Sequence, residues 1–203
     1  MSKKKMKSAN IKIFNDFKFF PVDTNFNKFL KKKMIIKKKI KNIAVFLGGG
    51  FYSKEFYKIA KTFRKKNYNV NFIIGYEIKK KNLNKIKSTN QNFKFHIKPK
   101  NIPEIIYKSD LVISGGGYTK VEAAYLSKPV IPIPIHFHQI ELCKRFKKQF
   151  NIDYLLKSEI EKLIIKKINN FSYGVRKKIS KNFRKIFYIN GVFRILKIIL
   201  NEK

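Results

Sequence analysis

Two runs of three glycines, at residues 48–50 and 115–117, constrain the fold more than any other feature of the sequence. Each follows a short, continuous apolar run, at residues 43–47 and 111–114, that is typical of a strand buried on both faces of a parallel sheet. Ligands of such sheets bind beyond the carboxyl ends of the strands, where both glycine runs are expected to lie. Because glycine lets backbone N–H groups approach a phosphate closely, the two runs predict two walls of a phosphate site. For either run alone a tight turn is the alternative, since neither has the spacing of a P-loop or of GxGxxG.

Strand and helix patterns alternate through the middle of the chain. Further strands are predicted at residues 70–74, 93–97 and 130–133, and Pro132 and Pro134 favour an early end or an edge position for the last of them. Helices are predicted at 54–66, 101–107, from about 119, from about 139 to 150, and in the region beyond 158, with a short last helix from Gly191 to about Leu200. Residues 77–92 have no clear pattern. The predicted fold class is therefore α/β: a Rossmann-like parallel sheet with helices on both faces and a helical C-terminal end.

Three helix starts carry capping signals. Ser53 is a predicted N-cap for the helix at 54–66. Asn101 with Glu104, and Ser158 with Glu161, have the spacing of a capping box.

The charge of the chain is strongly positive, with 48 Lys and Arg against 12 Asp and Glu and a formal net charge of +36. Only five of the basic residues are Arg, which is the better residue for forked phosphate contacts and for reading bases, so specific nucleic-acid recognition is not expected. An AT-rich coding sequence would give the same Lys surplus, whereas real use of the charge on an anionic membrane or a polyanion is the alternative. Fourteen Lys lie in residues 1–41, which are predicted to be a basic extension or linker before a domain at 42–203.

The remaining composition bears on disulfides, metal sites and the expected cellular location. One cysteine, Cys143, excludes a disulfide framework and a Cys-rich zinc site, and packing is its expected role. No Asp-x-Asp motif occurs, and no metal site is predicted. Without an apolar signal core or a long apolar run, the expected location is the cytoplasm.

Residues 113–139 carry a more specific pattern. A strand ends in Ser-Gly-Gly-Gly, a helix containing Glu122 follows, and then come a Lys-Pro turn, an apolar strand and a loop ending in Gln139. This segment resembles the nucleotide-sugar-binding C-terminal domain of GT-B glycosyltransferases of the family 28 type. That family's relatives include the peptidoglycan UDP-GlcNAc transferase and UDP-sugar hydrolases of nonulosonic-acid synthesis. The likeness runs from about residue 43 to 146, and more faintly to about 200, and implies one half of a GT-B fold acting in cell-surface polysaccharide synthesis.

The resemblance implies a role for each matching residue. Glu122 would accept hydrogen bonds from the ribose hydroxyls, and the backbone at Ile97 would meet the base. The diphosphate would lie between two sets of residues: Gly48 and Gly49 on one side, and Ser114, Gly115 and Gly116 on the other. Gln139 would reach the phosphates or the donor sugar. His138 is a weaker candidate as a proton donor, beside His136. Ordinary structural roles are the alternatives: an exposed helix glutamate for Glu122, and packed or solvated histidines for His96, His136 and His138.

The family's acceptor-binding N-terminal domain has no counterpart in the 42 residues before the first predicted strand. The resemblance therefore implies a UDP-sugar substrate, no separate cofactor, and a separate N-terminal-half subunit as partner, so that the chain alone binds nucleotide but turns over little. An anionic membrane is a further expected contact. A truncated remnant is the alternative to a split subunit. Hydrolysis of a UDP-sugar and a non-catalytic basic module that binds a polyanion or membrane also remain open as alternatives.

Overall fold

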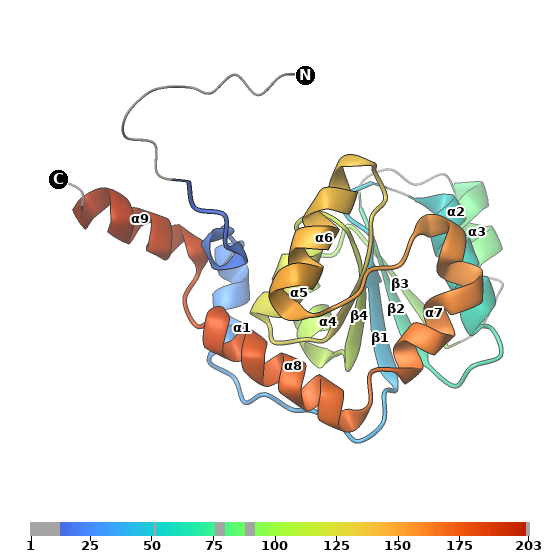
Figure 1. The fold of residues 1–203 in the computed structure, drawn as a ribbon. Coiled ribbons are helices and arrows are strands. Elements are labelled where there is room, and N and C mark those ends of the chain that lie inside the picture. Colours follow the sequence, from blue (N-terminus) through green and yellow to red (C-terminus); the bar gives the residue numbers. More distant parts are fainter. Residues whose placement is uncertain (1–12, 51, 76–79, 88–91, 202–203) are drawn as a thin grey trace.

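The computed structural model describes residues 13–50, 52–75, 80–87 and 92–201. Its centre is a parallel five-stranded sheet in the order β3-β2-β1-β4-β5 (Figure 1). The strands are β1 (Asn42–Phe46), β2 (Asn69–Ile74), β3 (Phe93–Ile97), β4 (Leu111–Gly115) and β5 (Val130–Ile133). All five predicted strands are confirmed to within a residue at each end, and β5 lies at an edge, as its prolines indicated.

Helices cover both faces of the sheet, and alternate strand residues supply the two cores. Ile43, Val45 and Leu47 face a first apolar cluster, which also contains side chains of α2 (Ser53–Phe63), α3 (Lys80–Lys87) and α7 (Ile160–Asn169). Ala44 and Phe46 face a second cluster. The helices of that second face are α4 (Ile102–Lys108), α5 (Thr119–Tyr125), α6 (His138–Phe150) and α8 (Tyr173–Ile186). The predicted α/β class is confirmed.

The helix at α3 falls where the sequence showed no clear pattern. Only Leu83 and Ile86 of this polar helix are described as buried in the first cluster. Two apolar contacts one turn apart hold the helix on the sheet, although they leave little periodicity to detect.

The capping predictions were partly wrong. Helix α2 begins at Ser53 itself, because the Tyr52 carbonyl already accepts the Phe56 N–H at 2.9 Å. Asn101 does hold the N-cap position of α4, but its side chain makes no capping bond. The start of α7 is preceded by a short 3₁₀ helix, η3 (Lys157–Glu159), where Glu159 rather than Glu161 accepts a backbone N–H, that of Leu156, at 2.8 Å. Glu161 instead pairs with Lys61 of α2, at 3.2 Å.

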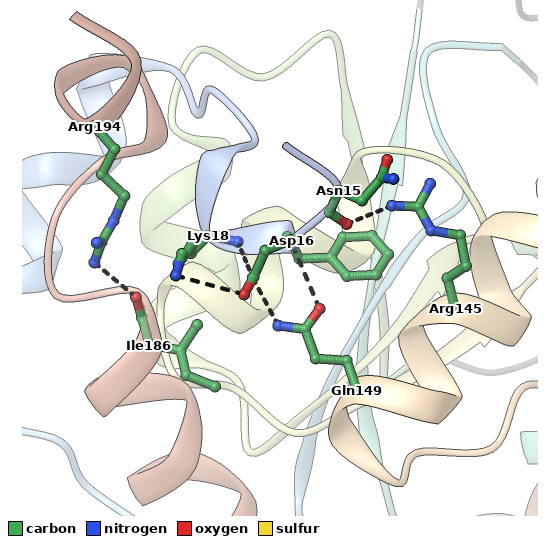
Figure 2. Close-up of polar contacts among 8 residues, drawn as sticks. Asn15, Asp16, Lys18, Arg145, Gln149, Ile186 and Arg194 are labelled. Carbon is green, nitrogen blue, oxygen red and sulfur yellow. Dashed lines mark hydrogen bonds and ion pairs between the residues drawn. The ribbon is translucent and has the colours of Figure 1, made fainter. Parts of the chain in front are cut away.

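The segment before the sheet packs against the second face through four buried side chains, Phe17, Val22, Phe26 and Phe29. It forms η1 (Phe17–Phe19), η2 (Thr24–Phe26) and α1 (Asn27–Leu30). Part of this segment lies against α6, as Figure 2 shows: Arg145 donates to the Asn15 carbonyl, and Gln149 donates to the Asp16 carboxylate at 2.8 Å. The domain boundary near residue 42 stays a prediction.

Asn190 fastens the same segment to the C-terminal helices. Its amide donates to the Val22 carbonyl at 2.7 Å and accepts the Val22 N–H at 3.3 Å. The next residue, Gly191, begins α9 (Gly191–Asn201), and a Cβ there would stand 2.3 Å from the Phe20 carbonyl oxygen. Only glycine allows this crossing. Beyond it, α9 extends away from the sheet (Figure 1).

Arg176 of α8 is buried, with 2% of its surface exposed, and it ties α8 to the approach to β1. Its guanidinium donates to the carbonyls of Phe171, Lys37 and Lys38 at 2.9–3.0 Å.

We expect Arg176→Ala to lower the free energy of unfolding by about 2–4 kcal/mol, because three carbonyls lose their donor and a cavity opens. Lys178→Ala, at an exposed position of the same helix, serves as the control and should change it by less than about 0.5 kcal/mol. Urea unfolding measures both. Equal effects of the two variants would contradict the role given to Arg176.

Candidate functional site

The carboxyl ends of β1, β2 and β4 meet so closely that glycine is required between them. A Cβ on Gly75, after β2, would lie 1.7 Å from the Gly49 carbonyl oxygen. One on Gly115 would lie 2.2 Å from the Leu47 carbonyl oxygen. The loop after β1 is therefore held between the ends of its two neighbouring strands. Both predicted glycine runs lie at this one edge of the sheet, and Gly75 joins them.

Two glycines of the β1 loop have special environments. Gly48 has a φ of +119°, which L side chains rarely adopt. Gly49 faces open space, because a Cβ built on it meets no atom within 4 Å. The backbone of Gly49 is thus accessible to a ligand at the carboxyl edge.

The β4 loop packs on the start of α6. A Cβ on Gly116 would come within 2.8–2.9 Å of Pro134, Gln139 and Cys143. The Gln139 side chain accepts the Ile135 N–H at 2.8 Å, which fixes it beside Gly116. Cys143 is buried, in agreement with its expected packing role, and burial raises the pKa of its thiol to about 11.

Tyr52 and two histidines stand at the rim of the same edge. The Tyr52 hydroxyl lies 3.2 Å from His136 Nε2 and links the β1 loop to the loop before α6. The rings of His136 and His138 stack 5.6 Å apart, and both are exposed. Sequence reasoning missed Tyr52. Its only signal was its position two residues after the glycine run.

Glu122 lies in α5, half-buried, and in the part of the chain that the structure describes its carboxylate has neither a hydrogen bond nor an ion pair. Burial raises the pKa of its carboxyl to about 7, and the negative charge of Asp23 adds to that shift. An unpaired carboxylate with a raised pKa is costly to keep and is typical of a functional position. Sequence reasoning found Glu122 but not Asp23, which comes from the N-terminal segment.

Three other predicted residues lie in different settings. The Ser114 hydroxyl is fully buried and donates to the Gly115 carbonyl at 3.0 Å. Ile97 ends β3, with 43% of its surface exposed, and is followed by Lys98 at a φ of +47°. His96 pairs with Asn71 at 2.9 Å between the neighbouring strands β3 and β2.

Lys120 was not recognised from the sequence, because it is one of many lysines. Its side chain is fully buried beneath the β4 loop, and its ammonium donates to the carbonyls of Gly116 and Gly117. Burial lowers the pKa of Lys120 to about 8.

Metal ligands do not gather in the structure as described: no group of three or more His, Cys, Asp or Glu side chains there could hold an ion. The donors at the edge are instead backbone N–H groups, an amide, a phenol and imidazoles. Such an arrangement can hold an anion through amides and a polyhydroxylated group through a carboxylate.

Solved structures with a similar fold include MurG of Acinetobacter baumannii, with a TM-score of 0.63 and 12% identity over 84% of this chain and 55% of that one. The calicheamicin glycosyltransferase CalG4 has a TM-score of 0.60 and 13% identity over 80% of this chain and 42% of that one. A UDP-GlcNAc 2-epimerase from Neisseria meningitidis, bound to UDP-GlcNAc, has a TM-score of 0.55 and 17% identity over 82% and 45%. The chain spans about half the length of these proteins. At such identities the likeness shows the fold.

Among curated proteins, no sequence matches this chain significantly. The family model described as "Glycosyltransferase family 28 C-terminal domain" matches residues 43–185, which is more than half of the chain and contains both glycine loops and Glu122. The chain therefore belongs to the glycosyltransferase family 28 C-terminal domain family.

Proposed function

We propose that this chain binds the UDP-sugar donor of a GT-B glycosyltransferase and acts with a separate acceptor-binding half. The observation that carries the proposal is the carboxyl edge of the sheet, where the accessible backbone at Gly49 and the unpaired Glu122 carboxylate belong to one family-matched domain. Two neighbours by fold support the choice of nucleotide: the epimerase bound to UDP-GlcNAc and an anthocyanidin 3-O-glucosyltransferase in complex with UDP.

In this proposal the diphosphate lies against Gly48 and Gly49 on one side and the loop of Gly115 and Gly116 on the other. Glu122 accepts hydrogen bonds from the ribose hydroxyls, and the backbone at Ile97 contacts the base. Gln139 lies beside the phosphates or the sugar. Loop amides stabilise the negative charge that grows on the diphosphate as the glycosidic bond breaks. The separate half supplies the base that deprotonates the acceptor. His138 and His136 stand exposed at the rim, where a bound sugar would pass.

The chain spans about half the length of the similar glycosyltransferases, so the proposal concerns the donor-binding half of such an enzyme. We also propose a cytoplasmic site of action, with peripheral contact to an anionic membrane, in cell-surface polysaccharide synthesis. The exposed apolar side chains of α9, among them Phe193, Ile199 and Leu200, and the positive charge of the chain support such a contact. Among the helices that the structure describes, none is both long and apolar enough to cross a membrane.

The test of the proposal is a calorimetric titration of the chain with UDP, compared with CMP and ADP, at high salt. We expect one-to-one binding selective for UDP, and an affinity at least about tenfold weaker in Glu122→Gln, which loses the charged acceptor for the ribose. Glu141→Gln, an exposed carboxylate of α6, is the matched control and should bind as the native chain does. Binding that vanishes with salt and ignores Glu122 would instead indicate non-specific polyanion attraction.

Gly49→Ala tests where the diphosphate lies. The added methyl has open space around it, so the free energy of unfolding should change by less than about 0.5 kcal/mol. It would, however, occupy the position that a phosphate needs, and we expect UDP affinity to fall at least about tenfold. Gly174→Ala, also with nothing within 4 Å of the added Cβ, is the control and should leave affinity unchanged. Equal UDP affinity in both variants would contradict a diphosphate position next to Gly49.

The raised pKa of Glu122 predicts a pH-dependent cost to stability. The folded-state pKa of about 7 exceeds the value of about 4.5 expected in the unfolded chain, so folding favours the protonated form. Stability from this group is present below about pH 4.5 and is lost as pH rises through 7. Glu122→Gln should therefore have a free energy of unfolding close to that of the native chain near pH 4.5, and one higher by about 3 kcal/mol at pH 8. Urea unfolding at both pH values checks this, and a gap independent of pH would contradict it.

A further inference from the structure

Lys120 is a buried cation with no carboxylate partner in the part of the chain that the structure describes. Its ammonium lies 5.5 Å from the centre of the Phe17 ring and 5.8 Å from that of Phe146. The titratable groups that affect it are the Cys143 thiol and the Arg145 guanidinium, both on α6. Asp16, on the segment that covers it, is already paired with Lys18 and Gln149. Burying a cation without an ion pair costs stability, so a role in the site would explain its presence.

The two hydrogen bonds of Lys120 fix the orientation of the β4 loop. In a trans peptide the C=O and the following N–H point in opposite directions. Because the carbonyls of Gly116 and Gly117 point toward the Lys120 ammonium, the N–H groups of Gly117 and Tyr118 point away from it. Neither N–H donates to any atom in the portion of the chain that the structure describes. Two free donors thus face away from the protein interior at the carboxyl edge.

The N-terminal segment closes the pocket around Lys120. The Phe17 ring covers it, and the Phe17 N–H donates to Gln149 Oε1 at 3.4 Å. The neighbouring contacts of Asn15 and Asp16 with α6 hold that ring in place (Figure 2). Water is thereby kept from the ammonium, and its bonds to the two loop carbonyls are strengthened.

We propose that Lys120 is a positioning residue for the diphosphate: it orients the amides of Gly117 and Tyr118 toward the ligand and places a positive charge beneath the loop. This inference rests on the proposed function, since it concerns the same site. It adds a residue that never touches the ligand and a requirement for the N-terminal segment that encloses it.

Lys120→Met tests the proposal, because methionine has a similar length and suits a pocket between two aromatic rings. The variant should still fold, because removal of an unpaired buried charge offsets the loss of two hydrogen bonds, yet it should bind UDP at least about tenfold more weakly. Lys128→Met is the matched control. Lys128 is also buried, and burial also lowers its pKa to about 8. It precedes β5 and so lies at the amino ends of the strands, opposite the carboxyl edge. That variant should bind UDP with native affinity.

Proton uptake gives a second readout that needs no loss of folding. A bound diphosphate above the loop should raise the pKa of Lys120, so that binding at pH 8.5 takes up about half a proton. Calorimetry in two buffers of different ionisation enthalpy measures this number. We expect the uptake in the native chain and in Lys128→Met, and none in Lys120→Met.

The outcomes separate the two proposals. No UDP binding by the native chain contradicts the proposed function itself. Native binding that is equally tight in Lys120→Met, or that shows no proton uptake at pH 8.5, overturns the role of Lys120 while leaving the donor site intact. Equal weakening by Lys120→Met and Lys128→Met also overturns it, because a general loss of positive charge would then explain both.

Discussion

The close approach of backbone at the carboxyl edge of the sheet is the constraint on which the rest of the structure depends. The loop after β1 is held between Gly75 and Gly115, at separations that no side chain would permit. This brings two chain segments far apart in sequence to within reach of one ligand. It also explains why glycine is needed outside the two runs. Gly75 allows the loop after β1 to lie against the end of β2, and Gly49 leaves the backbone of that loop accessible to a ligand.

Two ionisable groups at this edge, the half-buried Glu122 and the fully buried Lys120, have no partner of opposite charge in the part of the chain that the structure describes. Burial moves the pKa of Glu122 up and that of Lys120 down, and each shift reflects free energy that the fold gives up to keep the group where it is. The N-terminal segment contributes to both environments, through Asp23 near the carboxylate and Phe17 over the ammonium. A ligand that carries both phosphates and hydroxyl groups would offset these costs. Its hydroxyls would donate to the Glu122 carboxylate, and its negative charge would favour the charged form of Lys120.

The sequence predicted the sheet well because β1 and β4 are continuous apolar runs that lead into glycine, and the other strands are short apolar-rich segments between polar stretches. It failed at α3, where a polar helix buries few side chains. It also failed at two helix starts: the Tyr52 carbonyl, not Ser53, caps α2, and Glu159, not Glu161, accepts the backbone N–H before α7. Within the site, Glu122 and the glycines were found from local pattern and family likeness. Tyr52, Asp23 and Lys120 were not, because their contacts join distant segments and their residue types are common in this chain. The η1 and η2 turns also lack helical periodicity, so the buried aromatic side chains near residues 17–29 looked like part of a linker.

The contacts between Val22 and Asn190, and between Phe20 and Gly191, also have a consequence for biosynthesis. Phe20 and Val22 complete their packing only after Asn190 and Gly191 have been synthesised. At roughly 5–20 residues per second, the aromatic segment waits on the order of 10–30 s for its partner helix. During that interval the segment can already pack on α4 and α6, through Phe29 with Tyr107 and Phe17 with Phe146, but it lacks its contacts with Asn190 and Gly191. The Lys-rich residues on either side of the segment give neighbouring nascent chains a like charge, which opposes their association during this interval.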